Sequence, residues 1–121
     1  MTHSLPSASK VIQQLQSGSL TSVELVQACL NRIQEREPLV GAWEYLEAPD
    51  TLLDQAKRCD ELLSKGTADK PLLGLPVGVK DIFATKEMPT GWGTPIHSGR
   101  YFDYDAAIVE QIKAAGAIIV G

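Results

Sequence analysis

The stretch LLGLPVGVKDIF, residues 72–83, places a charged lysine at the end of a short apolar run. The valines and isoleucine of this run are typical of a strand, and we expect one over residues 75–83. A charged side chain is costly in a protein core unless it is paired or used in the chemistry. The role of Lys80 is therefore the first question that the sequence raises.

The residues that follow predict the rest of a βαβ unit. Residues 84–104 are rich in Pro, Gly and Thr and show no period, which indicates a loop. Asp105 is positioned to cap a helix that Gly116 ends. The all-apolar segment AIIV, residues 117–120, is typical of a parallel strand covered on both faces. We expect the strand, loop, helix and strand to form a right-handed crossover.

The first half predicts three helices. Apolar spacing indicates a helix over residues 9–16, with Gly18 ending it. Thr21 and Glu24 match a capping box, in which each side chain satisfies a backbone amide near the other. We expect the helix that this box opens to end before Pro38, which cannot continue it.

A short strand and a third helix are expected next. Residues 39–46 include Val40, Trp43 and Tyr45, residue types that are typical of a strand. Asp50 is then expected to cap a helix with a wide apolar stripe, which Gly66 closes. A polar linker over residues 67–70 separates the two halves.

These elements place the chain in the α/β class as one domain over residues 1–121. Residues 1–66 form the helical part, and residues 67–121 form the βαβ part that carries Lys80. A length of 121 residues, with 44% hydrophobic residues, is enough for one buried core.

Charge and composition argue against several classes of partner. The net charge is −4 and the basic residues are scattered, so we expect no binding of nucleic acid. No apolar run approaches the roughly 20 residues of a membrane helix, so no membrane association is expected. The first ten residues lack the charged-then-apolar order of a secretory signal, which makes the cytoplasm the expected location.

The cysteines and histidines do not predict a site. Cys29 and Cys59 each lie on the apolar stripe of an expected helix, and we interpret both as free thiols in a core. His3 and His97 stand apart from any carboxylate–histidine pattern. We therefore expect no metal site among these residues.

Lys80 has two interpretations. Its stem could lie along apolar surface while the ammonium stays in water, which would carry no function. Alternatively, a desolvated amine could serve as a base, because burial disfavours the charged form of an amine. The long loop after Lys80 leaves the carboxyl end of a parallel strand, where open α/β sheets bind ligands. Asp81 need not pair with Lys80, because successive side chains of a strand point to opposite faces.

The sequence around Lys80 resembles the amidase signature family. The resemblance covers nearly the whole chain, in order and with matching spacing. The segments that carry it are Leu20–Leu25, Gly74–Phe83, Met88–Thr90, Gly93–Ile96, Asp105–Val109 and Ala114–Gly121.

This resemblance implies an amide hydrolase with a Ser–cis-Ser–Lys triad, the first part of a mixed-sheet fold, and no cofactor. Lys80 matches the lysine of that triad. The partner implied is a small-molecule amide substrate, and a homo-oligomer is possible. The Gly/Ser-rich segment with the two serines has no counterpart within these residues. We therefore expect a truncated segment of a longer protein that is inactive on its own.

Two alternatives remain open at this stage. The chain could be a segment of a glutamyl-tRNA amidotransferase A subunit, although the sequence of residues 81–96 is more similar to that of the broad bacterial amidases. It could also be a truncated, non-catalytic interaction module.

Overall fold

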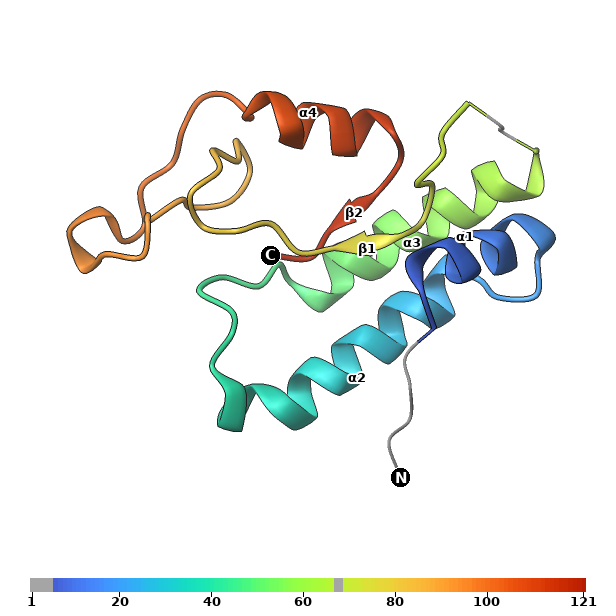
Figure 1. Ribbon diagram of the computed structural model, residues 1–121, viewed down its shortest axis with the longest axis horizontal. Coiled ribbons are helices and arrows are strands. Elements are labelled where there is room, and N and C mark those ends of the chain that lie inside the picture. Colours follow the sequence, from blue (N-terminus) through green and yellow to red (C-terminus); the bar gives the residue numbers. More distant parts are fainter. Residues whose placement is uncertain (1–5, 67–68) are drawn as a thin grey trace.

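The computed structural model describes residues 6–66 and 69–121 of the chain. The fold is mixed α/β, as predicted. Helices α1 (Ala8–Ser17), α2 (Ser22–Val40) and α3 (Pro49–Ser64) precede strand β1 (Pro76–Val77); a 3₁₀ turn η1 (Pro95–His97), helix α4 (Ala107–Ala114) and strand β2 (Ile118–Ile119) follow. In Figure 1 the two strands lie between α4 on one side and the first three helices on the other.

The first helix and the start of the second follow the prediction. The Ser7 side chain accepts a hydrogen bond from the Lys10 amide, and Gly18 ends α1 in the left-handed conformation. The capping box of α2 is present in full: the Thr21 hydroxyl accepts from the Glu24 amide, and the Glu24 carboxylate accepts from the Thr21 amide. A local sequence signal therefore fixes this helix start.

The prediction that α2 ends before Pro38 is wrong. The helix includes Pro38 and continues to Val40, where Gly41 adopts a left-handed conformation and its amide donates to the Glu37 carbonyl. Proline in the last turn of a helix removes only one hydrogen bond. The glycine cap that follows closes the turn and allows the helix to finish.

The strand predicted over residues 39–46 is also wrong. Leu39 and Val40 belong to α2, and no regular element forms between Gly41 and α3. Trp43 instead packs into the core. The Glu47 amide donates to the carbonyl of Val120, which places this extended segment beside the end of β2. The apolar residues of this segment thus reflect packing against the core rather than pairing in a sheet.

The start of α3 differs from the prediction and its end agrees. Asp50 is not the cap, because the N-cap residue is Ala48, two residues earlier, and the helix begins at Pro49. Proline is favoured at this first position, where its missing amide costs nothing. Asp50 lies in the first turn, where a negative charge complements the helix dipole. Gly66 follows the helix in the left-handed conformation, and residues 67–68 of the predicted linker lie outside the described residues.

The strands pair in parallel, as predicted, with Pro76 opposite Ile118 and Val77 opposite Ile119. The first strand is shorter than the predicted residues 75–83. It ends because residues 80–83 fold back into a turn, in which the amides of Ile82 and Phe83 donate to the Lys80 carbonyl.

Both faces of β2 are covered. Ile118, 1% exposed, packs with Val26 and Leu52 from α2 and α3. Ile119, 5% exposed, packs on the opposite face with Val109 of α4. This confirms the interpretation of AIIV as a buried parallel strand.

The long loop and α4 follow the expected order. Residues 84–104 contain only turns and η1. Asp105 is not the cap of α4: Ala106 holds that position without a side-chain hydrogen bond, because the Asp105 carboxylate is bonded elsewhere. Gly116 ends the helix region with a φ of +95°, and a Cβ at this position would lie 2.8 Å from Leu73 Cα.

Across the described ranges, no helix has both the length and the apolar character needed to cross a membrane.

Candidate active site at the carboxyl ends of the strands

Lys80 lies just beyond the carboxyl ends of the two strands. The Val79 amide donates to the Gly121 carbonyl over 3.0 Å, which continues the pairing of β1 with β2. The chain then turns at once, because the Lys80 carbonyl accepts from the amides of Ile82 and Phe83. Lys80 is therefore the first residue after the paired segment, where open α/β sheets place their ligand sites.

The Lys80 side chain is exposed, and among the described residues its ammonium has no hydrogen-bond or ion-pair partner. A pocket of about 30 Å³, with room for one or two water molecules, lies beside it. Its walls include Tyr45, Val79, Phe83, Met88, Thr90 and Gly121. The described residues hold Lys80 at the rim of this pocket and do not bury its amine.

Asp81 connects the Lys80 turn to the loop that follows. Its carboxylate accepts hydrogen bonds from the amides of Gly91 at 2.8 Å and Gly93 at 3.2 Å. Its backbone carbonyl accepts from the Trp92 amide at 3.0 Å. The carboxylate makes no ion pair with Lys80, in agreement with the opposite-face argument from the sequence. The bonds to the loop were not predicted.

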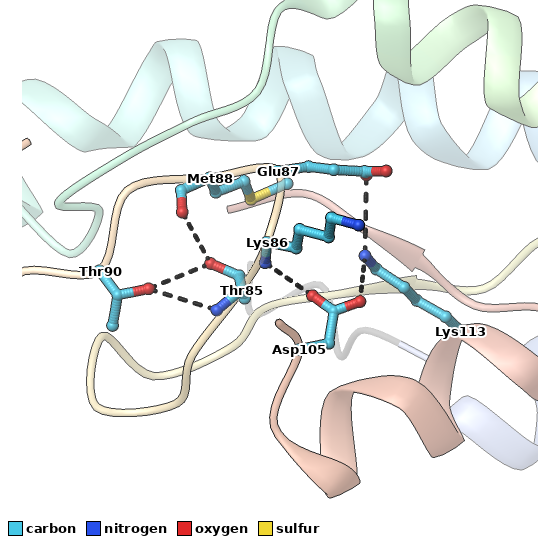
Figure 2. Close-up of polar contacts among 7 residues, drawn as sticks. All are labelled: Thr85, Lys86, Glu87, Met88, Thr90, Asp105 and Lys113. Carbon is cyan, nitrogen blue, oxygen red and sulfur yellow. Dashed lines mark hydrogen bonds and ion pairs between the residues drawn. The ribbon is translucent and has the colours of Figure 1, made fainter. Parts of the chain in front are cut away.

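Two buried threonines hold the near part of the loop together. The Thr85 hydroxyl donates to the Met88 carbonyl at 3.1 Å and lies 3.2 Å from the Thr90 hydroxyl (Figure 2). The Thr85 amide donates to that same Thr90 hydroxyl. Because these groups are buried, each bond gives a partner to a polar atom that would otherwise be unsatisfied. The pair fixes Met88 and Thr90 in the wall of the pocket beside Lys80.

A second polar group joins the loop to α4 (Figure 2). The Asp105 carboxylate accepts from the Lys86 amide at 2.7 Å and from the Lys113 ammonium at 2.8 Å. Lys113 also lies 3.7 Å from the carboxylate of the exposed Glu87. Partial burial acts to raise the pKa of Asp105, but the bonds from Lys113 and Lys86 and their charges outweigh it, so the pKa is below its ordinary value.

The cysteines and His97 lie outside this constellation. Cys29 and Cys59 are free, half-buried thiols, and burial raises the pKa of each, which weakens them as nucleophiles at neutral pH. His97 Nδ1 lies 3.3 Å from the Arg100 guanidinium. His3 is outside the described residues. Within the described ranges, no group of three or more His, Cys, Asp or Glu side chains is placed to hold a metal ion.

Comparison with known proteins decides the family. The family model named Amidase matches residues 24–121, which include the strands, the loop and Lys80. The chain belongs to the amidase family. The resemblance that the sequence motifs indicated is thereby confirmed.

The amidase fold is also visible in solved structures. The native peptide amidase from Stenotrophomonas maltophilia is similar over 99% of this chain and 25% of its own, with a TM-score of 0.86 and 29% sequence identity. The four helices and the parallel strand pair are therefore arranged as in part of that amidase.

Other proteins that are similar to this chain in sequence are named as amidotransferase subunits rather than as amidases. The A subunit of the glutamyl-tRNA(Gln) amidotransferase of Chloroflexus aggregans is 40% identical over 107 residues, which are 88% of this chain and 22% of that protein. The corresponding A subunit of Rhodopirellula baltica is 38% identical over 117 residues, or 97% of this chain and 23% of that protein. The chain thus spans less than a quarter of the length of these relatives.

Proposed function

We propose that these residues supply the lysine of an amide-bond hydrolase that uses a Ser–cis-Ser–Lys triad. The observation that carries the proposal is the place of Lys80, at the carboxyl ends of a parallel strand pair within the segment that matches the amidase family. In this proposal the nucleophilic serine and the middle serine lie in a part of the protein outside these 121 residues. A protein of these 121 residues alone is therefore inactive.

Lys80 acts as the terminal base in this proposal. Its neutral amine takes a proton from the middle serine, which takes one from the nucleophilic serine as that oxygen attacks the amide carbon. The C–N bond then breaks, and the proton passes back through the middle serine to the leaving amine. Water repeats the sequence on the acyl-enzyme and releases the acid. No metal or organic cofactor takes part in these steps.

This chemistry requires surroundings that the 121 residues do not provide alone. The Lys80 amine is exposed here, and a base of this kind needs a desolvated site. Further chain in the complete protein covers the rim of the pocket. The described residues contribute the position of the lysine, through the turn that starts at Lys80 and the loop held by Thr85 and Thr90.

The substrate class has two candidates. The first candidate is a small linear amide, and the likeness to a protein named peptide amidase supports an amide as the substrate. The second candidate is the substrate of an amidotransferase A subunit, which the 40% identity to such a protein favours. Purified full-length protein that hydrolyses simple amides without partners supports the first. Glutamine hydrolysis only in the presence of partner proteins supports the second.

The test of Lys80 is a conservative substitution in the full-length protein. Arginine keeps the charge but cannot give up its proton, so Lys80→Arg should lower turnover by several orders of magnitude, as should Lys80→Ala. Lys65→Arg, at an exposed lysine after α3, is the matched control and should be silent. A melt checks folding. A folded Lys80→Arg enzyme with nearly wild-type turnover would remove Lys80 from the mechanism.

A further inference from the structure

The backbone on the two sides of Lys80 is held by different contacts. On the amino-terminal side, the Val79 amide is bonded to Gly121 at the end of β2. On the carboxyl-terminal side, Asp81 makes three hydrogen bonds to residues 91–93, two through its carboxylate and one through its backbone carbonyl. The sheet thus fixes one side of Lys80, and the loop fixes the other through Asp81.

The turn that Asp81 contacts has an unusual backbone. The Thr94 amide donates to the Gly91 carbonyl over 3.2 Å and closes a four-residue turn. Its two central residues, Trp92 and Gly93, have φ values of +57° and +70°. A bulky residue rarely adopts this left-handed region, and among the described residues Trp92 is the one non-glycine residue that does. Such backbone persists only where surrounding contacts fix it.

The carboxylate of Asp81 is suited to fixing this turn. An ionised carboxylate only accepts hydrogen bonds, and its two oxygens each receive one backbone amide of the turn. Gly91 leaves room for this approach, because a Cβ there would lie 3.3 Å from Asp81 Oδ2. Both carboxylate oxygens are thus hydrogen-bonded to the turn, and the carboxylate forms no ion pair with Lys80.

We infer that Asp81 is a positioning residue for Lys80: its carboxylate holds the Gly91–Thr94 turn and so fixes the backbone that carries the lysine. This inference rests on the proposed role of Lys80 as a base. Loss of the carboxylate would remove two of the three bonds between Asp81 and the turn, so that only the bond from the Trp92 amide would tie this side of Lys80 to the loop, while the sheet bond at Val79 remains. The amine would then lose its alignment with the middle serine, and a displacement of about 1 Å can lower a rate roughly 100-fold.

The experiment compares Asp81→Ala, Asp81→Asn and Asp103→Ala in the full-length enzyme. Asp103 lies in the same loop, is exposed and has no partner among the described residues, so its variant is the control. We expect kcat to fall about 100-fold in Asp81→Ala and about tenfold in Asp81→Asn, which keeps one acceptor oxygen. KM should change less than about threefold, and the pH profile of kcat should shift.

Four outcomes are decisive. A folded Asp81→Asn enzyme with wild-type kcat and pH profile overturns the inference, even if Asp81→Ala does not fold. A lower melting temperature with an unchanged pH profile assigns Asp81 a structural role only and also overturns it. An inactive Lys80→Arg enzyme alongside normal Asp81 variants rejects this inference alone, whereas an active Lys80→Arg enzyme rejects the proposed function.

Discussion

Replacing Asp105 with alanine should release the loop of residues 84–104 from α4. The carboxylate is 14% exposed and accepts hydrogen bonds from the Lys86 amide at 2.7 Å and the Lys113 ammonium at 2.8 Å. Both bonds vanish in Asp105→Ala. Lys113 would keep only the longer contact with Glu87, and the Lys86 amide would have to bond to water.

The size of the effect follows from these two bonds. A hydrogen bond that involves a charged group contributes about 1.5–3 kcal/mol. The lower end of this range, about 1.5 kcal/mol, applies to each of the two bonds, because the Lys113 side chain is 33% exposed and Lys86 is an exposed residue. Water recovers part of the loss at both donors, so we expect about 2 kcal/mol. That free energy corresponds to a roughly 30-fold change in a local opening equilibrium.

Hydrogen exchange in the full-length protein measures this opening directly. The amides of Lys86 and of Ala106, which donates to the Ala84 carbonyl, should exchange about 30-fold faster in Asp105→Ala. Glu87→Ala is the matched control, because it removes only an exposed ion pair of 3.7 Å, worth about 0–1 kcal/mol. Equal effects of the two substitutions would refute the reasoning.

The pH dependence gives a second check on Asp105. Its pKa in the folded protein lies below the ordinary value of 3.8, so its stabilising effect is fully present above that value. The effect should be lost as the pH falls from 3.8 through the lower pKa of the folded state. Wild type and Asp105→Ala should therefore converge in acid. A difference that stays constant or widens there would show that the carboxylate is not the stabilising group.

Two further predictions concern the core and the isolated chain. Leu52→Ala should destabilise the full-length protein by about 2–5 kcal/mol, because Leu52 is fully buried among α2, α3 and β2, whereas Leu39→Ala, at a side chain that is 85% exposed, should be nearly neutral in a denaturant titration. A purified chain of these 121 residues should turn over no amide or ester, and turnover that Lys80→Ala abolishes would mean that another nucleophile lies within it.

Helix termini were predictable where the signal is local. The Thr21 and Glu24 pair satisfies two amides within one turn, so a few residues of sequence are enough to place the start of α2. Asp50 and Asp105 match the residue preference for a cap but do not serve as one. A proline at the first position moves the start of α3, and Asp105 bonds to Lys86 and Lys113 instead. Composition does not reveal such competing partners.

Long-range contacts set the limits of what the sequence predicts. Residues 39–46 contain valine and aromatic residues that are typical of a strand, but Trp43 packs over Gly78 and Gly121, which are distant in sequence. Within the candidate site, Lys80 was singled out because the sequence around it resembles that of a family. The contacts of Asp81 gave no such signal, since its partners are Gly91 and Gly93 in a loop without any period. Side chains that fix loops are therefore found in structures rather than in patterns.

The placement of β2 sets the order in which this part of the protein can fold. Ile118 and Val120 complete the core that Val26, Leu52 and Ala56 begin, yet they lie far downstream of α2 and α3 in the sequence. On the ribosome, these two helices emerge first and can pair only loosely until residues 118–120 follow. During the same interval the apolar strand β1 has no parallel partner, because β2 has not yet emerged, and its edge is unpaired. A pause in synthesis after β1 has left the ribosome and before residues 118–120 have done so would therefore expose the nascent chain to association and to chaperone binding.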